Sequence, residues 1–183
     1  MQQRATFEDA GWDFAAVWRI YEGNSYPYLR ALLPHDTTDL IPPGGATLFS
    51  IIDQTGYEFK TGTFTDVVRF THTYEPILPT FVPEGMLDIG YTLSVTAVYS
   101  GTGLPAQPTI PVSVTVRYGD AEGRGTAFSP LSLWRLGGTG WEELESTDDS
   151  GQQILTALID HFSQFSLFGD AGQRVFLLLV LRQ

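Results

Sequence analysis

"VSVTVRY", residues 112–118, decides the fold class of this sequence. Apolar side chains occupy positions 112, 114, 116 and 118, and polar side chains occupy the positions between them. Successive side chains of a β-strand point to opposite faces, so a period of two predicts a strand with one buried face and one solvent face.

The same period extends outward from this stretch in both directions. It recurs in "DVVRFTHTY" (66–74), "YTLSVTAVY" (91–99) and "ILTALI" (154–159), while "LSLWRL" and "WEEL" flank the turn "GGTG" (137–140) as a hairpin. Proline-rich connectors separate the strands, and no window shows a sustained helical period. We therefore predict an all-β, antiparallel, immunoglobulin-like β-sandwich over residues 41–170, after an aromatic-rich cap segment (1–40) and before an apolar strand or tail (171–183).

Composition excludes several classes of function. Ten Lys and Arg face 21 Asp and Glu, which gives a formal net charge of -11, and the 183 residues include no cysteine. The acidic surface disfavours nucleic acid and membrane surfaces as partners, and the lack of cysteine removes thiol catalysis, disulfides and cysteine metal sites. The apolar run Val175–Leu181 is too short for a membrane span, which needs about 20 residues.

The first segment carries a motif of known surface proteins. Its residues Gly11–Phe14, Val17–Ile20 and Glu22–Leu29 read Gly-Trp-Asp-Phe, Val-Trp-Arg-Ile and Glu-Gly-Asn-Ser-Tyr-Pro-Tyr-Leu. This segment resembles the last coil, or cap, of bacterial β-solenoid surface proteins of the GLUG-repeat and haemagglutinin-like kind. The resemblance implies an upstream β-solenoid, and therefore a gene start inside a longer protein or a chain that is a fragment.

A second resemblance covers residues 44–169. Its motifs are Gly62–Phe64 leading to Val68, then Pro111–Tyr118, Leu131–Trp141 and finally His161–Phe165. In this order and spacing they resemble the ZU5-like β-sandwich module at the ends of bacterial extracellular proteins. The ending "RVFLLLVLRQ" (174–183) is similar to the short apolar-then-arginine tails of some secreted bacterial proteins.

His161, Phe162 and Ser163 form the sharpest candidate for chemistry. In some eukaryotic ZU5-type proteins, and in a nucleoporin domain, the same tripeptide cuts itself between Phe and Ser. The resemblance implies that Ser163 attacks the carbonyl of Phe162 in an N-to-O acyl shift while His161 moves protons. The alternative is a bulge or bend in the strand pattern, where His161 and Ser163 form local hydrogen bonds and the phenylalanines fill the core.

The remaining candidates favour structural roles. His72 lies between Phe70 and Tyr74 on one strand face, which predicts a buried, hydrogen-bonded histidine. His35, beside Asp36 and Asp39, lacks the further ligands of a transition-metal site, and "STDDSG" (146–151) indicates a hairpin turn rather than a calcium loop. Exposed aromatic side chains could stack on sugars, although aromatic residues of a sandwich usually belong to its core. We expect no metal and no cofactor.

These features lead us to expect a non-catalytic structural or interaction module of a secreted or cell-surface, adhesin-like bacterial protein. Its expected partners are the upstream β-solenoid or neighbouring surface domains. Two alternatives stay open: a domain that cleaves itself between Phe162 and Ser163, and a filament subunit that adds its apolar tail to the sheet edge of a second copy.

Overall fold

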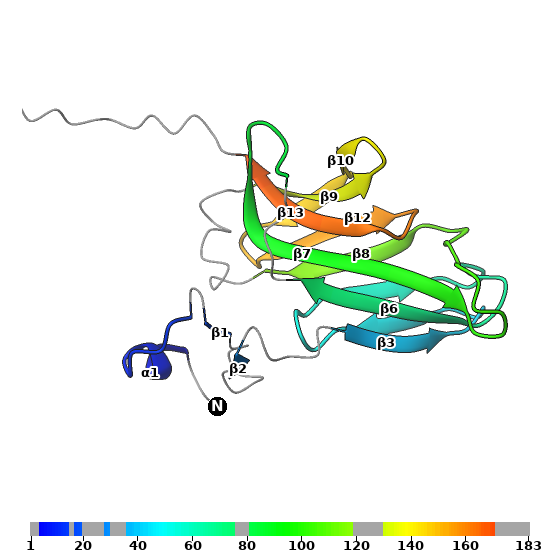
Figure 1. Ribbon diagram of the computed structural model, residues 1–183, viewed down its shortest axis with the longest axis horizontal. Helices are drawn as coiled ribbons and strands as arrows, with labels where there is room; N and C mark the ends of the chain where they lie inside the picture. The colour runs from blue at the N-terminus through cyan, green and yellow to red at the C-terminus, as the bar shows by residue number, and fades with distance from the viewer. Residues whose placement is uncertain are drawn as a thin grey trace, which may run out of the picture.

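Two antiparallel β-sheets pack face to face in the computed structural model (Figure 1). The structure describes residues 4–14, 17–19, 28–29, 36–75, 81–118 and 130–170. In chain order the elements are α1 (Arg4–Glu8), β1 (Trp18–Arg19), β2 (Tyr28–Leu29), β3 (Asp36–Ile41), β4 (Ala46–Phe49), β5 (Gly56–Phe59), β6 (Val68–Glu75), β7 (Met86–Tyr99), β8 (Val112–Arg117), β9 (Leu131–Gly137), β10 (Gly140–Glu143), β11 (Ser146–Asp149), β12 (Ile154–Ile159) and β13 (Gln164–Asp170). The prediction of an antiparallel β-sandwich is confirmed.

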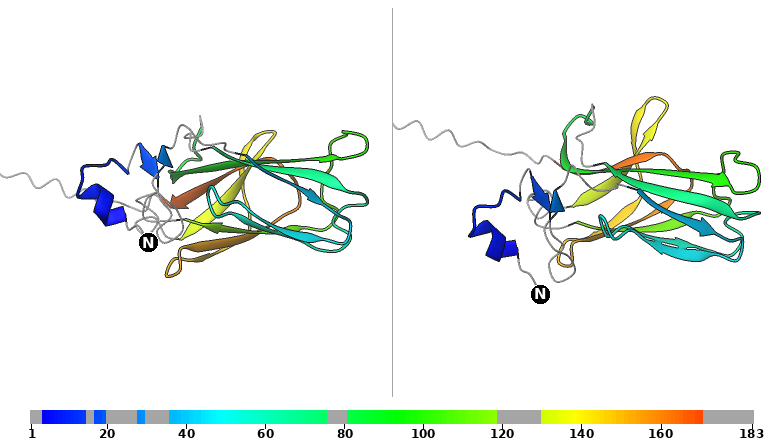
Figure 2. Two further views of the ribbon diagram at one scale, coloured as in Figure 1. Left: turned by 90° about the horizontal axis from the view of Figure 1, so that it is seen from below. Right: turned by 60° about the horizontal axis from the view of Figure 1, so that its bottom comes forward.

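The chain passes back and forth between the two sheets. Among the described strands, one sheet has the order β10-β9-β13-β7-β6-β3 and the other the order β11-β12-β8-β5-β4. Figure 2 shows the two layers edge-on. Strands that follow one another in sequence, such as β5 and β6 or β12 and β13, therefore lie in opposite layers.

Alternation along the strands produces the core. In β8 the residues Val112, Val114 and Val116 are buried between the sheets, with Tyr118 just beyond the strand, whereas Ser113 and Thr115 face outward. The predicted inner faces of β6 and β7 are buried in the same way, which confirms the period-two interpretation. The buried core includes Val68, Phe70, His72, Tyr74, Tyr91, Leu93, Val95, Ala97, Leu155, Ala157, Ile159, Phe162, Phe165 and Leu167.

The predicted turn at residues 146–151 is only partly correct. Ser146–Asp149 form strand β11, which pairs with β12, and the turn comes after it at residues 150–153. The strand is held because the Asp148 carboxylate accepts hydrogen bonds from the Tyr118 hydroxyl and from the backbone N–H of Leu131. These contacts come from distant parts of the chain, so local turn propensity gave the wrong boundary.

Aromatic side chains of the amino-terminal segment pack against one another. The ring centroids of Trp12 and Trp18 lie 4.3 Å apart, and Phe7 lies 5.3 Å from Trp12 and 6.3 Å from Phe14. Helix α1 and the short pair β1–β2 lie beyond one end of the sandwich (Figures 1 and 2). Part of the predicted aromatic surface is thus covered within the segment itself.

Candidate functional site

His161, Phe162 and Ser163 lie where the chain crosses from one sheet to the other. The bend at residues 160–163 joins β12 of one layer to β13 of the other. Phe162 is buried, and its ring packs 5.4 Å from that of Phe70 and 6.0 Å from that of Phe64. The predicted bend is confirmed, and its polar sequence reflects a crossing at the surface between two apolar strands.

Hydrogen bonds fix this bend on both sides. The Phe162 N–H donates to Oε1 of Gln107 at 2.7 Å, and the carbonyl of Ser163 accepts from the N–H of Val95 at 2.8 Å. The Ser163 hydroxyl donates to the carbonyl of Leu136 at 2.7 Å, and His161 is exposed. Ser163 is therefore engaged with a neighbouring strand. None of residues 160–163 has the positive φ that would indicate a strained backbone. Self-cleavage stays a prediction.

Arg135 forms a clamp, made of two ion pairs, between the same bend and the β9–β10 hairpin. Its Nη1 lies 2.8 Å from Oδ1 of Asp160, and its Nη2 lies 2.8 Å from Oε2 of Glu142. The hydrogen bond that Arg135 donates to Glu142 raises the pKa of Arg135; partial burial opposes this effect, and the charge of Asp160 adds to it. An open depression of about 470 Å³ lies beside this clamp, and His161 and Ser163 are among its lining residues. The guanidinium is already paired twice, so the depression offers little free positive charge to a ligand.

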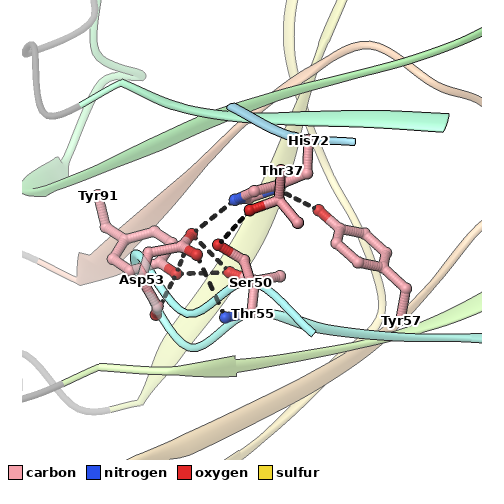
Figure 3. Close-up of polar contacts among 7 residues, drawn as sticks. All are labelled: Thr37, Ser50, Asp53, Thr55, Tyr57, His72 and Tyr91. Carbon is pink, nitrogen blue, oxygen red and sulfur yellow. Dashed lines mark hydrogen bonds and ion pairs between the residues drawn. The ribbon is translucent and has the colours of Figure 1, made fainter. Parts of the chain in front are cut away.

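A connected group of polar side chains lies inside the sandwich (Figure 3). We call it the buried polar cluster. Its members come from β3, β6 and β7 of one layer, and from β5 and the β4–β5 turn of the other. They are Thr37, Ser50, Asp53, Thr55, Tyr57, His72 and Tyr91.

Asp53 is the centre of the buried polar cluster. Its Oδ2 lies 2.9 Å from Nε2 of His72. The same oxygen accepts hydrogen bonds from the hydroxyls of Tyr91 at 2.8 Å and Thr55 at 2.7 Å. The side chains of Asp53 and His72 are both 0% exposed. A buried carboxylate is tolerable only with such partners.

The other nitrogen of His72 is also occupied. Its Nδ1 lies 2.7 Å from the Tyr57 hydroxyl, and the two rings are 5.6 Å apart. A second chain of contacts runs from Thr37, whose hydroxyl donates to that of Ser50 at 3.2 Å, and from Ser50 to Asp53. The prediction of a buried, hydrogen-bonded His72 is confirmed.

The electrostatics of the buried polar cluster favour the ionised carboxylate. Burial by itself raises the pKa of Asp53, but the hydrogen bond and positive charge of His72, with the hydroxyls of Ser50 and Thr55, outweigh it and lower the pKa from 3.8 to about 2. Burial, and then the charge of Asp53, raise the pKa of Tyr57 well above 10.0. The phenol of Tyr57 therefore stays protonated at neutral pH.

A tight turn places Asp53 in the core. The N–H of Gln54 donates to the carbonyl of Ser50 at 2.9 Å, and Gln54 itself adopts a left-handed conformation with φ of 60°. The turn points Asp53 and Thr55 inward and leaves Ile51 78% exposed. Sequence reasoning missed Asp53 as the partner of His72; the local signal was the aspartate two residues before a threonine, a pattern that favours side-chain-capped turns.

Among the described residues, Asp36 and Asp39 do not form a metal site with His72 or His161. His35 lies outside the described residues, and Asp36 and Asp39 are exposed on edge strand β3. Within the described part of the chain no group of three or more His, Cys, Asp or Glu side chains could hold a metal ion.

Comparison with known proteins gives one partial likeness. No protein-family model matches the chain. A stretch of 96 residues is 35% identical to a protein of Evansella cellulosilytica named "Putative Gly-rich membrane protein"; the match covers 44% of this chain and 11% of that protein. The likeness is thus confined to a small part of a much longer relative. In the described residues no helix is both long enough and apolar enough to cross a membrane.

Proposed function

We propose that this chain is a non-catalytic structural or interaction module of a secreted or cell-surface, adhesin-like bacterial protein. Its partners would be an upstream β-solenoid or neighbouring domains of the same surface protein. No nucleic acid enters this proposal, because the net charge of -11 disfavours it, and no inserted membrane segment enters it, because the apolar run Val175–Leu181 is shorter than the about 20 residues that a span needs.

The observation that carries the proposal is the enclosure of the buried polar cluster. A catalytic side chain must touch its substrate, whereas Asp53, Thr55 and His72 are each 0% exposed. Their polar atoms contact one another and tie the β4–β5 turn to the facing sheet. The arrangement supports a scaffold whose residues stabilise a sandwich rather than a reaction centre.

The partial relative is in keeping with a module of a larger surface protein. It is named a membrane protein, and the match covers only 11% of its length. Sandwich domains are common modules of multi-domain extracellular proteins.

Surface display is the property to test. An epitope tag would be inserted in the exposed turn at residues 101–103 of the protein in the bacterium that encodes it. We expect antibody labelling and loss of the tag to added protease on intact cells, with a tagged cytosolic enzyme as the protected control. Labelling that requires lysis of the cells would reject the proposed setting.

Self-cleavage is tested separately by intact mass. Purified chain that ran as two pieces, residues 1–162 and 163–183, would support the alternative, and Ser163→Ala should then give one piece. A single intact mass after prolonged incubation would remove it. We expect the single mass, because the Ser163 hydroxyl is directed at the carbonyl of Leu136.

Self-assembly through the tail is tested by size. The tail, residues 171–183, lies outside the described residues. Light scattering with chromatography on the full chain and on a chain ending at Asp170 would decide the matter. A monomer in both cases removes the filament alternative, and an oligomer that needs the tail supports it.

A further inference from the structure

An aromatic platform stands on the outer face of the larger sheet. Leu131 and Leu133 of β9 point into the core, so Trp134 and Leu136 point outward. Trp141 of β10 lies directly opposite Leu136 on the same face. We use the name aromatic platform for Trp134, Leu136 and Trp141.

The ring of Phe168 packs against both indoles of the platform and fixes their positions. Phe168 of β13 is completely buried although it lies on the outer face, because the two indoles cover it. The ring of Phe168 meets Trp134 at 5.8 Å and 79°, and Trp141 at 5.2 Å and 81°. Such edge-to-face contacts fix the orientation of both indoles. A ligand would therefore meet surfaces that need little reordering on binding.

The polar atoms of the platform are already used within the protein. Nε1 of Trp134 donates to the Ser132 hydroxyl at 2.9 Å, and Nε1 of Trp141 donates to the carbonyl of Phe81 at 2.7 Å. The indoles thus offer only apolar ring surface. Leu136 is 38% exposed and both indoles are half-buried, so part of this apolar surface reaches the solvent.

The carboxylate of Glu143 borders the platform and selects among ligands. Glu143 is exposed and lies opposite Trp134 in the register of β9 and β10, so its carboxylate is on the face of the indoles. Carboxylates accept hydrogen bonds but repel phosphate, and the net charge of -11 adds to this repulsion. Nucleotide bases also stack on aromatic rings, but their phosphates would be repelled here.

The size of the platform argues against a folded protein partner. A stable protein interface buries about 800 Å² on each side around an apolar centre. Three side chains beside one carboxylate suit one or two ring-shaped groups that present one apolar face and donate hydrogen bonds from their edges. The rings of a neutral sugar have this chemistry, with C–H groups on the face and hydroxyls on the edge.

We propose that the aromatic platform binds a neutral polysaccharide, with sugar rings stacked on Trp134 and Trp141 and hydroxyls donating to Glu143. The proposal rests on the proposed function in one respect, since such a polymer would be met outside the cell. The neutral polysaccharide would be the partner that the interaction module binds.

The test is electrophoresis of the full chain through gels that contain soluble cellulose, xylan, β-1,3-glucan or starch. We expect at least one of these neutral polymers to retard the wild-type chain, and the polyanion alginate to leave it unretarded. Trp141→Ala and Leu136→Glu should weaken the binding at least about tenfold, and Glu143→Gln should weaken it less. Leu158→Ala removes an exposed apolar side chain from the other sheet, at 60% exposure, and is the matched control.

Two variants separate a loss of binding from a loss of the fold. Trp141→Ala removes packing on Phe168 and could lower stability, whereas Leu136→Glu changes only an outward-facing side chain; thermal unfolding of each variant checks the fold. No retardation by any neutral polymer overturns the proposal, as does undiminished binding by folded Leu136→Glu. Binding is measured on purified protein, so a chain that binds sugar but is not displayed on cells rejects only the proposed setting.

Discussion

Replacement of Asp53 by asparagine tests whether the buried polar cluster stabilises the sandwich. Asparagine has the same size but no charge, and its amide group would place N–H donors against hydroxyls and a histidine that now donate to the carboxylate. His72 would keep its contact with Tyr57 but would lose the only carboxylate beside it in the described residues. The expected result is a large loss of stability without loss of the fold.

The magnitude follows from two independent estimates. Lowering the pKa of Asp53 from 3.8 to about 2 corresponds to about 2 kcal/mol of stability at neutral pH. Removal of one partner of a buried ion pair costs about 3–5 kcal/mol. We therefore expect Asp53→Asn to reduce the free energy of unfolding by about 2–5 kcal/mol at pH 7, out of a typical total of about 5–15 kcal/mol.

The pH dependence identifies the carboxylate as the cause. A carboxyl whose pKa is lower in the folded state stabilises the fold above its unfolded pKa, and this contribution is lost as the pH falls through the folded pKa. The difference between wild type and Asp53→Asn should therefore be complete above about pH 4 and shrink toward pH 2.

Urea unfolding followed by tryptophan fluorescence at pH 7, 4 and 2.5 measures these differences. The exposed Asp36→Asn on β3 is the control for loss of one negative charge and should change stability by less than about 0.5 kcal/mol. A loss below about 1 kcal/mol for Asp53→Asn at pH 7, or an equal loss at pH 2.5, would refute the reasoning.

Three further substitutions test other parts of the fold. Phe162→Ala should cost about 3–5 kcal/mol by leaving a cavity beside Phe64 and Phe70, and a cost under 1 kcal/mol in urea unfolding would show that the bend is not anchored in the core. Arg135→Ala should cost no more than about 1 kcal/mol, since its partners are partly exposed, and the cost should fall further in 1 M salt. Gln54→Gly relieves a left-handed residue and should leave the thermal midpoint unchanged or raise it by a few degrees; a marked fall would contradict the conformation of the β4–β5 turn.

Strand faces were predictable because burial and alternation are both local. The inner residues of "VSVTVRY" are the ones that the core encloses, and His72 followed from its place between Phe70 and Tyr74. The strand after Trp141 was not predictable, because Asp148 is held by Tyr118 and Leu131 rather than by its neighbours in sequence.

The buried polar cluster could not be predicted either, because distant parts of the chain form it. Strand β5 and the loop after it separate Asp53 from His72, and no spacing in the chain relates the two residues. Only the pairing of strands and the packing of one sheet on the other bring the carboxylate within 2.9 Å of the imidazole. The aromatic platform likewise needs three strands side by side, since Trp134, Trp141 and Phe168 belong to β9, β10 and β13.

The sequence by itself determined the all-β class, the inner and outer faces of the main strands and the acidic character of the surface, because each depends on composition or on neighbours one or two residues apart. Tertiary structure alone decided which polar residues are buried together and which aromatic residues share an exposed face. Those contacts depend on strand order and on the distance between layers, which the packing of the whole chain sets.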